Sequence, residues 1–123
     1  MTQPELIALE IKKALNVDIY DKRKFQDIVD ARSIYCHILR NDLNFTLYEI
    51  RDSFNIKGKD YHHASVLHSE KMFKEALLRK PHFEYIKDNI LSLISPKHAL
   101  IKAINKLDDE KIKLVENYIN TIL

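Results

Sequence analysis

The fold is decided by residues 46–68, which read TLYEIRDSFNIKGKDYHHASVLH. Thr46 and Glu49 have the Thr-x-x-Glu spacing of a capping box, which predicts that a helix begins directly after Thr46. The helix should be short, because several polar turn residues and the only glycine of the chain, Gly58, follow within a few positions. The apolar positions expected to face inward are Leu47, Ile50 and Phe54.

A longer helix is expected from about His62 to Arg79, where Pro81 ends it. Its buried side should consist of Val66, Phe73 and Leu77. Gly58 falls in the turn between the two helices, where a tight reversal often needs a positive φ. Short helix, turn and longer helix follow in the order of a helix-turn-helix, although an ordinary helical hairpin has the same spacing.

Two helices are expected before this stretch. The first should run from about residue 3 to 16, opened by a Thr2–Glu5 capping box, with Leu6, Leu9, Ile11, Ala14 and Leu15 as its apolar stripe. The second should run from about residue 27 to 40, where apolar residues recur at three- and four-residue steps. These residues are Ile28, Ala31, Ile34, Tyr35, Ile38 and Leu39.

Three further helices are expected in residues 81–123, at about 82–94, 96–105 and 109–122. This segment holds six basic and six acidic residues and is rich in Leu and Ile. It suits packing on the core or on a second copy of the chain, so a homodimer through the C-terminal helices is one expectation. Together the patterns predict an all-α protein of five to seven helices, folded as a single domain over residues 1–123.

The composition supports this class. One glycine and three prolines among 123 residues leave few residues for hairpins and sheets. The net charge is only +2, but residues 51–80 hold seven Lys and Arg against four acids. The single cysteine, Cys36, lies in an apolar helical stretch and is read as a packed thiol. No apolar run has the form of a signal peptide or a membrane span, so a cytoplasmic protein without membrane contact is expected.

Three ordered blocks of the chain resemble the C-terminal DNA-binding domain of the bacterial replication initiator DnaA, a Trp repressor-like helix-turn-helix. Ile28-Val29-Asp30-Ala31-Arg32 is similar to the segment that opens a long helix in that family. Leu47-Tyr48-Glu49-Ile50 matches the start of its next helix, and His63-Ala64-Ser65-Val66-Leu67-His68 matches its D-H-[ST]-T-V-[LIM]-H signature. The resemblance covers about residues 15–80.

The resemblance implies sequence-specific binding of double-stranded DNA without catalysis or a cofactor. Side chains from the first turn of a recognition helix read base edges in the major groove. The expected contacts to bases are His62, His63, Ala64 and Ser65, with Arg32 as the minor-groove reader. The expected contacts to phosphates are Lys24, Thr46, Lys57 and Lys59. A freestanding module of this kind would serve replication or transcription control in a bacterium, prophage or mobile element.

The chain departs from the family pattern in two places. Tyr61-His62-His63 stands where the family has Arg-Asp-His, so its sequence preference should differ. The turn between Phe54 and Val66 is about four residues longer, which could re-aim the recognition helix. The chain has no G-x-x-x-x-G-K-[ST] loop, so no nucleotide binding is expected.

Two other functions are compatible with parts of the sequence. His62, His63 and His68 could suggest a metal site, but their separations of one, five and six residues spread them over different sides of a helix. The stronger alternative is a small all-α adaptor that contacts proteins through its C-terminal helices, which the low net charge favours.

Overall fold

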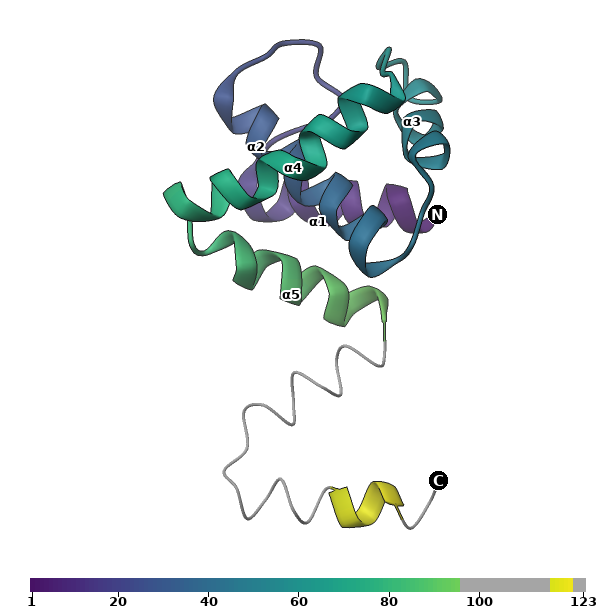
Figure 1. Cartoon of the computed structure of the whole chain (residues 1–123), viewed down its shortest axis with the longest axis vertical. Helices are drawn as coiled ribbons and strands as arrows, with labels where there is room; N and C mark the ends of the chain where they lie inside the picture. Colours follow the sequence, from purple (N-terminus) through teal and green to yellow (C-terminus); the bar gives the residue numbers. More distant parts are fainter. Residues whose placement is uncertain (96–115, 121–123) are drawn as a thin grey trace. The chain divides into compact units, whose positions relative to one another are not determined.

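The computed structural model describes residues 1–95 and 116–120 (Figure 1). The elements are α1 (Gln3–Leu15), α2 (Gln26–His37), the π-helix η1 (Ile38–Asp42), α3 (Leu47–Asn55), α4 (His63–Arg79) and α5 (Phe83–Ile94). Residues 116–120 are also helical, and no strand occurs among the described residues. The prediction of an all-α protein is therefore confirmed.

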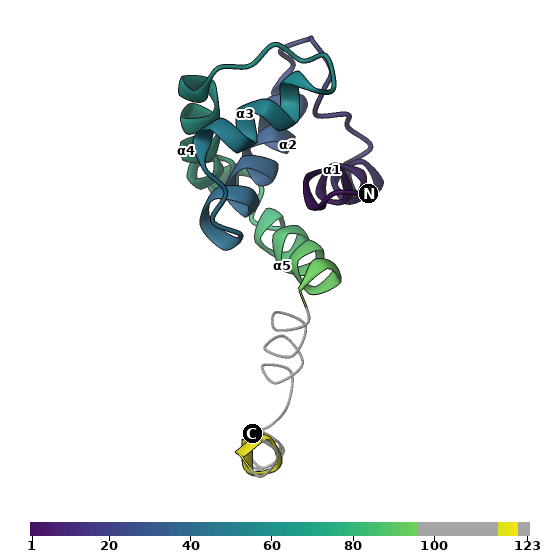
Figure 2. The same ribbon diagram turned by 90° about the vertical axis from the view of Figure 1, so that its right-hand side faces the viewer.

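The chain divides into two compact units, Met1–Ile90 and Leu91–Leu123, where the sequence predicts one domain. Within the first unit, α2 packs chiefly on α4, while α1 contacts α2 and α3 contacts both α4 and η1. Figures 1 and 2 show α2 enclosed by these helices. Every contact of the site discussed below lies in the first unit.

The predicted helix starts and stops of α1 and α3 are confirmed. Thr2 and Glu5 form a reciprocal capping box at α1, and Thr46 and Glu49 form one at α3. Asn16 ends α1 in the left-handed conformation, with φ 56°, and its N–H donates to the carbonyl of Lys12. These ends are fixed by local hydrogen bonds, which is why the sequence alone locates them.

The core is built around α2, as its periodicity predicts. Its buried apolar side chains are Ile28, Ala31, Ile34, Tyr35 and Cys36, and Ile38 and Leu39 continue the row. The helix differs from the prediction after His37, where it widens into η1 and the N–H of Leu43 donates to the carbonyl of Ile38 over 3.0 Å. Ile38 and Leu39 are both fully buried, as are the consecutive residues Ile34, Tyr35 and Cys36 within α2.

The buried face of α1 differs from the predicted stripe. Ile11 is buried as predicted, but Leu9 and Ala14 are exposed, and Ile7 and Ala8, which lie outside the predicted stripe, are buried. Ile7 and Ile11 lie one turn apart on a single face, so they form a better contact surface toward α2 than a stripe through Leu9 would.

The remaining helical predictions are only partly covered by the described residues. α5 matches the helix expected at 82–94, and Phe83 and Ile90 are buried. The helix expected at 96–105 lies outside the described residues, as does most of the one expected at 109–122. No helix in the described part of the chain is both long and apolar enough to cross a membrane.

Candidate functional site

A groove of about 570 Å³ opens at the start of α4. It is lined by Lys24, Arg32, Lys59, Asp60, Tyr61, His62, Ala64, Ser65, His68 and Ser69. Six of the nine residues expected to contact DNA therefore come together here, from the segment before α2, from α2, and from the turn and first helical residues around the start of α4. We call this surface the basic groove.

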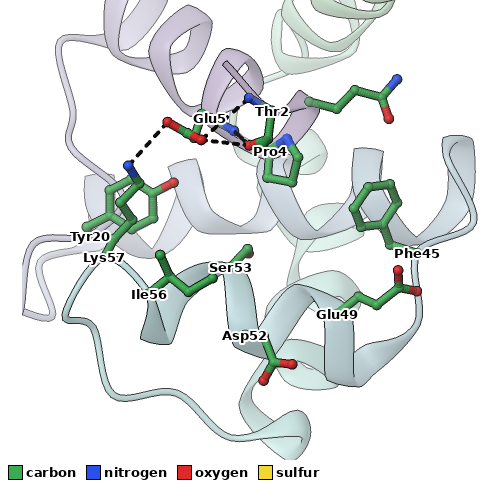
Figure 3. A pocket seen from close by; sticks show the side chains of 11 residues that line it. Thr2, Pro4, Glu5, Tyr20, Phe45, Glu49, Asp52, Ser53, Ile56 and Lys57 are labelled. Carbon is green, nitrogen blue, oxygen red and sulfur yellow. Dashed lines mark hydrogen bonds and ion pairs between the residues drawn. The ribbon is translucent and has the colours of Figure 1, made fainter.

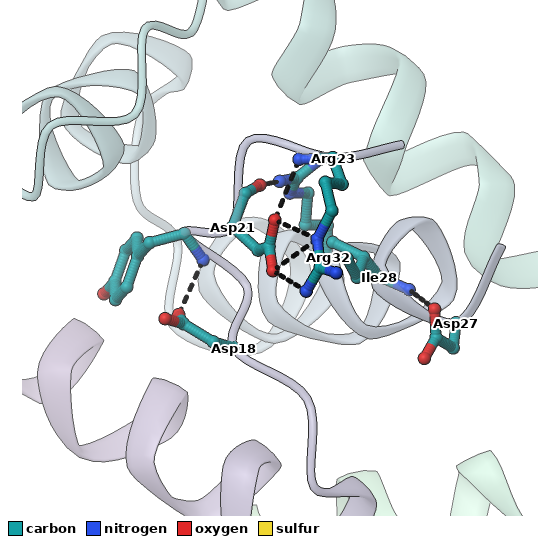
Figure 4. Close-up of polar contacts among 7 residues, drawn as sticks. Asp18, Asp21, Arg23, Asp27, Ile28 and Arg32 are labelled. Carbon is teal, nitrogen blue, oxygen red and sulfur yellow. Dashed lines mark hydrogen bonds and ion pairs between the residues drawn. The ribbon is translucent and has the colours of Figure 1, made fainter. Parts of the chain in front are cut away.

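Arg32 does not take the position that the family resemblance implies for a minor-groove reader. Its side chain is 4% exposed, and its Nε donates to the carbonyl oxygen of Ile19 over 2.7 Å. Its Nη2 donates to the carbonyl oxygen of Asp21 (Figure 4). Because these donors are committed to the backbone, Arg32 fastens the segment between α1 and α2 onto α2 and does not extend from the surface.

The same segment is tightened by its own side chains. The Asp21 carboxylate accepts from Nε and Nη2 of Arg23, the latter over 2.6 Å (Figure 4). The hydrogen bonds from the Arg23 side chain, and next its backbone N–H, lower the pKa of Asp21 to about 2. Lys24, which is exposed, thus follows directly after a segment that these contacts hold in place.

Tyr61 is buried and fixes the turn between α3 and α4 through its contacts with both helices. Its ring stacks on Phe54 with centroids 4.2 Å apart, and its hydroxyl shares a hydrogen bond with Ser69. Its N–H donates to the Asn55 side chain over 2.9 Å. Gly58 has φ +80°, so the predicted need for a positive φ in this turn is confirmed.

Lys59 lies close enough to other basic side chains for their charges to interact. Partial burial is the main cause that lowers its pKa, and the positive charges of Arg32 and Lys24 lower it further, while Asp60 opposes them. The basic groove therefore concentrates positive charge that Asp60 only partly offsets.

α4 begins without the side-chain caps that open α1 and α3. His62 precedes it in an extended conformation and makes no side-chain hydrogen bond to the helix. The first turn of α4 contains no acidic residue. The positive end of the helix dipole is therefore open toward the basic groove, which Ala64 and Ser65 line.

His63 lies outside the basic groove, against α3. Its ring is 5.6 Å from that of Tyr48, and the Arg51 guanidinium lies 5.1 Å over the Tyr48 ring. Tyr48 is 58% exposed. Sequence reasoning did not identify Tyr48 and Arg51 as site residues, because only the packing of α3 beside α4 brings them to His63.

Thr46 and Lys57 lie apart from the basic groove. Thr46 caps α3 by accepting from the Glu49 N–H over 3.1 Å, and it lines a separate hollow with Tyr48. Lys57 Nζ lies 3.3 Å from Oε2 of Glu5, beside a cavity of about 440 Å³ between α1 and α3 (Figure 3). Although it is only two residues from Lys59, Lys57 faces a different part of the molecule.

The histidines and the cysteine of the chain lie in different surroundings. Within residues 1–95 and 116–120, no three His, Cys, Asp or Glu side chains are grouped so that they could hold a metal ion. Cys36 is buried, and this burial raises the pKa of its thiol, which keeps the thiol protonated.

Comparisons with protein-family models, curated proteins and solved structures give no match for this chain.

Proposed function

We propose that this chain binds double-stranded DNA through a helix-turn-helix formed by α3 and α4, with the basic groove at the protein–DNA interface. The supporting observation is the grouping of Lys24, Lys59 and the first turn of α4 around one groove. Residues from separate segments gather there, and their basic charge exceeds the acidic charge of Asp60. Such a surface suits the phosphate backbone of DNA.

The exposed first turn of α4 supplies groups that could read base edges. His62, His63 and Ala64 are exposed, whereas Val66 is fully buried and anchors the helix to the core. Histidine can donate to or accept from base edges, and alanine can contact a thymine methyl group. In this proposal α4 is the recognition helix and the Tyr48–His63 pair lies at its start, beside α3.

The buried position of Arg32 changes one role that the DnaA resemblance implies. Arg32 positions the segment that presents Lys22, Arg23 and Lys24, all of which are exposed. In this proposal these exposed side chains contact phosphates, and Arg32 contributes its charge from the floor of the groove. The resemblance thus supports the order of the motif, while the details of recognition differ.

Selection from a library of random duplexes tests this function. We expect enrichment of a common sequence after several rounds, and loss of that enrichment when His63 is replaced by alanine. Each lost base contact should cost about 1–3 kcal/mol of specific binding. A two-fold symmetric site would indicate that a dimer binds. The absence of any duplex binding would contradict the proposal and favour the protein-interaction adaptor.

A role in replication or transcription control follows as part of the same proposal. A reading module that carries no catalytic machinery can act by occupying its site or by recruiting a partner. The sequence that the selection recovers would show where such sites occur in the genome that encodes the chain.

A further inference from the structure

We infer that the basic groove is a binding site for one phosphoryl group, which we call the phosphate seat. Lys24, Lys59 and the start of α4 would hold the group beside the guanidinium of Arg32. This inference deepens the proposed DNA binding, and it rests on that function only where the phosphoryl group belongs to DNA. The argument combines a cavity, a cluster of basic side chains and an uncapped helix start.

The lining of the basic groove suits an anion, because basic side chains from separate segments surround one concave surface. The open groove has a volume of about 570 Å³, with cationic groups from three separate segments around it. The Arg32 guanidinium is held in place by two backbone carbonyls, so its charge is already positioned before a ligand arrives. A pre-positioned charge loses little conformational entropy on binding.

The basic side chains around the groove repel one another. Arg32 and Lys24 both destabilise the protonated form of Lys59, although Asp60 partly opposes them. An anion between these groups would remove the mutual repulsion and be bound by all three. Asp60 is the one acidic side chain in the lining, so the charge of the groove stays positive.

The start of α4 adds backbone donors on the same side. No acidic residue occupies its first turn, and no side chain of His62 caps it. Unpaired N–H groups at a helix start bind anions, above all phosphate. A phosphoryl group would contact these N–H groups beside Ala64 and Ser65 while the lysines neutralise its charge.

Titration of the ¹⁵N-labelled full-length chain with inorganic phosphate, and separately with a 5′-mononucleotide, tests the seat. Sodium chloride at matched ionic strength is the reference. We expect saturable shifts of the backbone amides from Lys59 to Ser65 with both phosphate compounds and none with chloride.

Three variants locate the effect. Lys59→Gln should weaken phosphate binding by about tenfold, because a charge-assisted hydrogen bond is lost. Ala64→Asp should abolish it, since the new carboxylate competes for the same donors, while an acidic residue in the first turn favours the helix itself. Lys57→Gln is the matched control: it changes a lysine of the same turn that pairs with Glu5 outside the groove, and phosphate binding should persist.

Competition with duplex DNA distinguishes the source of the phosphoryl group. If duplex displaces phosphate, the seat holds a backbone phosphate of DNA. If phosphate binds and the duplex does not, the seat stands, the DNA proposal fails, and the ligand is a small phosphorylated molecule. If neither inorganic phosphate nor the mononucleotide shifts residues 59–65, the seat is overturned, whether or not the chain binds DNA.

Discussion

The Nε of Arg32 lies 2.7 Å from the carbonyl oxygen of Ile19, thirteen residues earlier in the chain. Through this bond and its partner to the Asp21 carbonyl, a side chain of α2 fixes the segment that carries Lys24. Arg32 is therefore a positioning residue whose loss should affect folding and binding together. A residue that only read DNA would affect binding alone.

Replacing Arg32 with leucine should lower the free energy of unfolding by about 3 kcal/mol, because two backbone carbonyls lose a charged donor. Urea denaturation measures this change. Arg23→Gln, which removes an exposed ion pair with Asp21, should cost much less than Arg32→Leu. Equal stability of Arg32→Leu and the unmodified chain would show that the buried hydrogen bonds do not hold this segment.

Asp30 connects α2 to the end of α4. Its carboxylate accepts from Arg79 at 2.9 and 3.0 Å and from Gln26 at 2.8 Å, and Lys80 Nζ lies 3.2 Å away. Burial alone would raise the pKa of Asp30, but the hydrogen bonds from Arg79, Gln26 and Lys80 outweigh it and hold the pKa below its usual value.

Because the pKa of Asp30 is depressed in the folded state, its stabilising contribution is present above about pH 4 and is lost as the pH falls through the folded value. Asp30→Asn should cost about 2 kcal/mol at pH 7 and flatten the acid dependence of stability, as measured by urea denaturation between pH 2 and 7. Asp52→Asn, at an exposed ion pair with its neighbour Arg51, is the matched control and should cost less than about 1 kcal/mol. If Asp30→Asn lost as much stability between pH 7 and pH 2 as the unmodified chain, Asp30 would not be a source of the acid dependence.

The local features of the fold could be predicted from sequence, and the distant ones could not. Capping boxes at Thr2 and Thr46, and the positive φ at Gly58, depend on residues within a few positions of one another. The π-helix after His37 and the exposed position of Leu9 depend on how helices pack, which a single helix does not encode.

The same division applies to the candidate site. The sequence predicts nine residues that act together at a DNA interface, and six of these nine line one groove. The sequence could not show that Lys57 pairs with Glu5, 52 residues away, or that Arg32 is buried. It also gave no signal for Tyr48 beside His63, since that contact joins two helices.

The stability of the chain should also depend on pH through His37. Its ring stacks on Phe73 at 4.2 Å, and Nδ1 lies 3.8 Å from Glu70. Burial lowers the pKa of His37 and the charge of Lys87 lowers it further, against the opposing effect of Asp42, Glu70 and Glu84.

Because the pKa of His37 is lower in the folded state than in the unfolded state, the unfolded chain binds a proton at this histidine more readily. Protonation therefore favours unfolding. Stability should therefore decline as the pH falls below about 6.5 toward the lower folded pKa of His37. Thermal unfolding between pH 8 and 5 measures this trend, and His37→Gln should reduce it. The prediction fails if the variant and the unmodified chain lose the same stability over this range.

There is space for a side chain at Gly58, but the backbone conformation at this position is unfavourable for residues other than glycine. No atom lies within 4 Å of the position that a Cβ would take, yet φ is +80°. Gly58→Ala should cost about 1 kcal/mol in urea denaturation, and Gly58→Asn should cost less because asparagine adopts positive φ more readily. Equal losses for the two variants would show that φ is not the cause.

The salt dependence of duplex binding tests the central claim most directly. Fluorescence anisotropy with a random duplex, measured over a series of salt concentrations, gives the slope of log affinity against log salt for the unmodified chain and for Lys24→Gln/Lys59→Gln. We expect a steep negative slope for the unmodified chain, and a slope smaller by about 2 for the double variant, since each lost phosphate contact removes about 0.9. Lys12→Gln/Lys74→Gln, which changes two exposed lysines outside the basic groove, should leave the slope unchanged. No duplex binding, or an equal loss of slope in both double variants, would contradict a DNA interface at the start of α4.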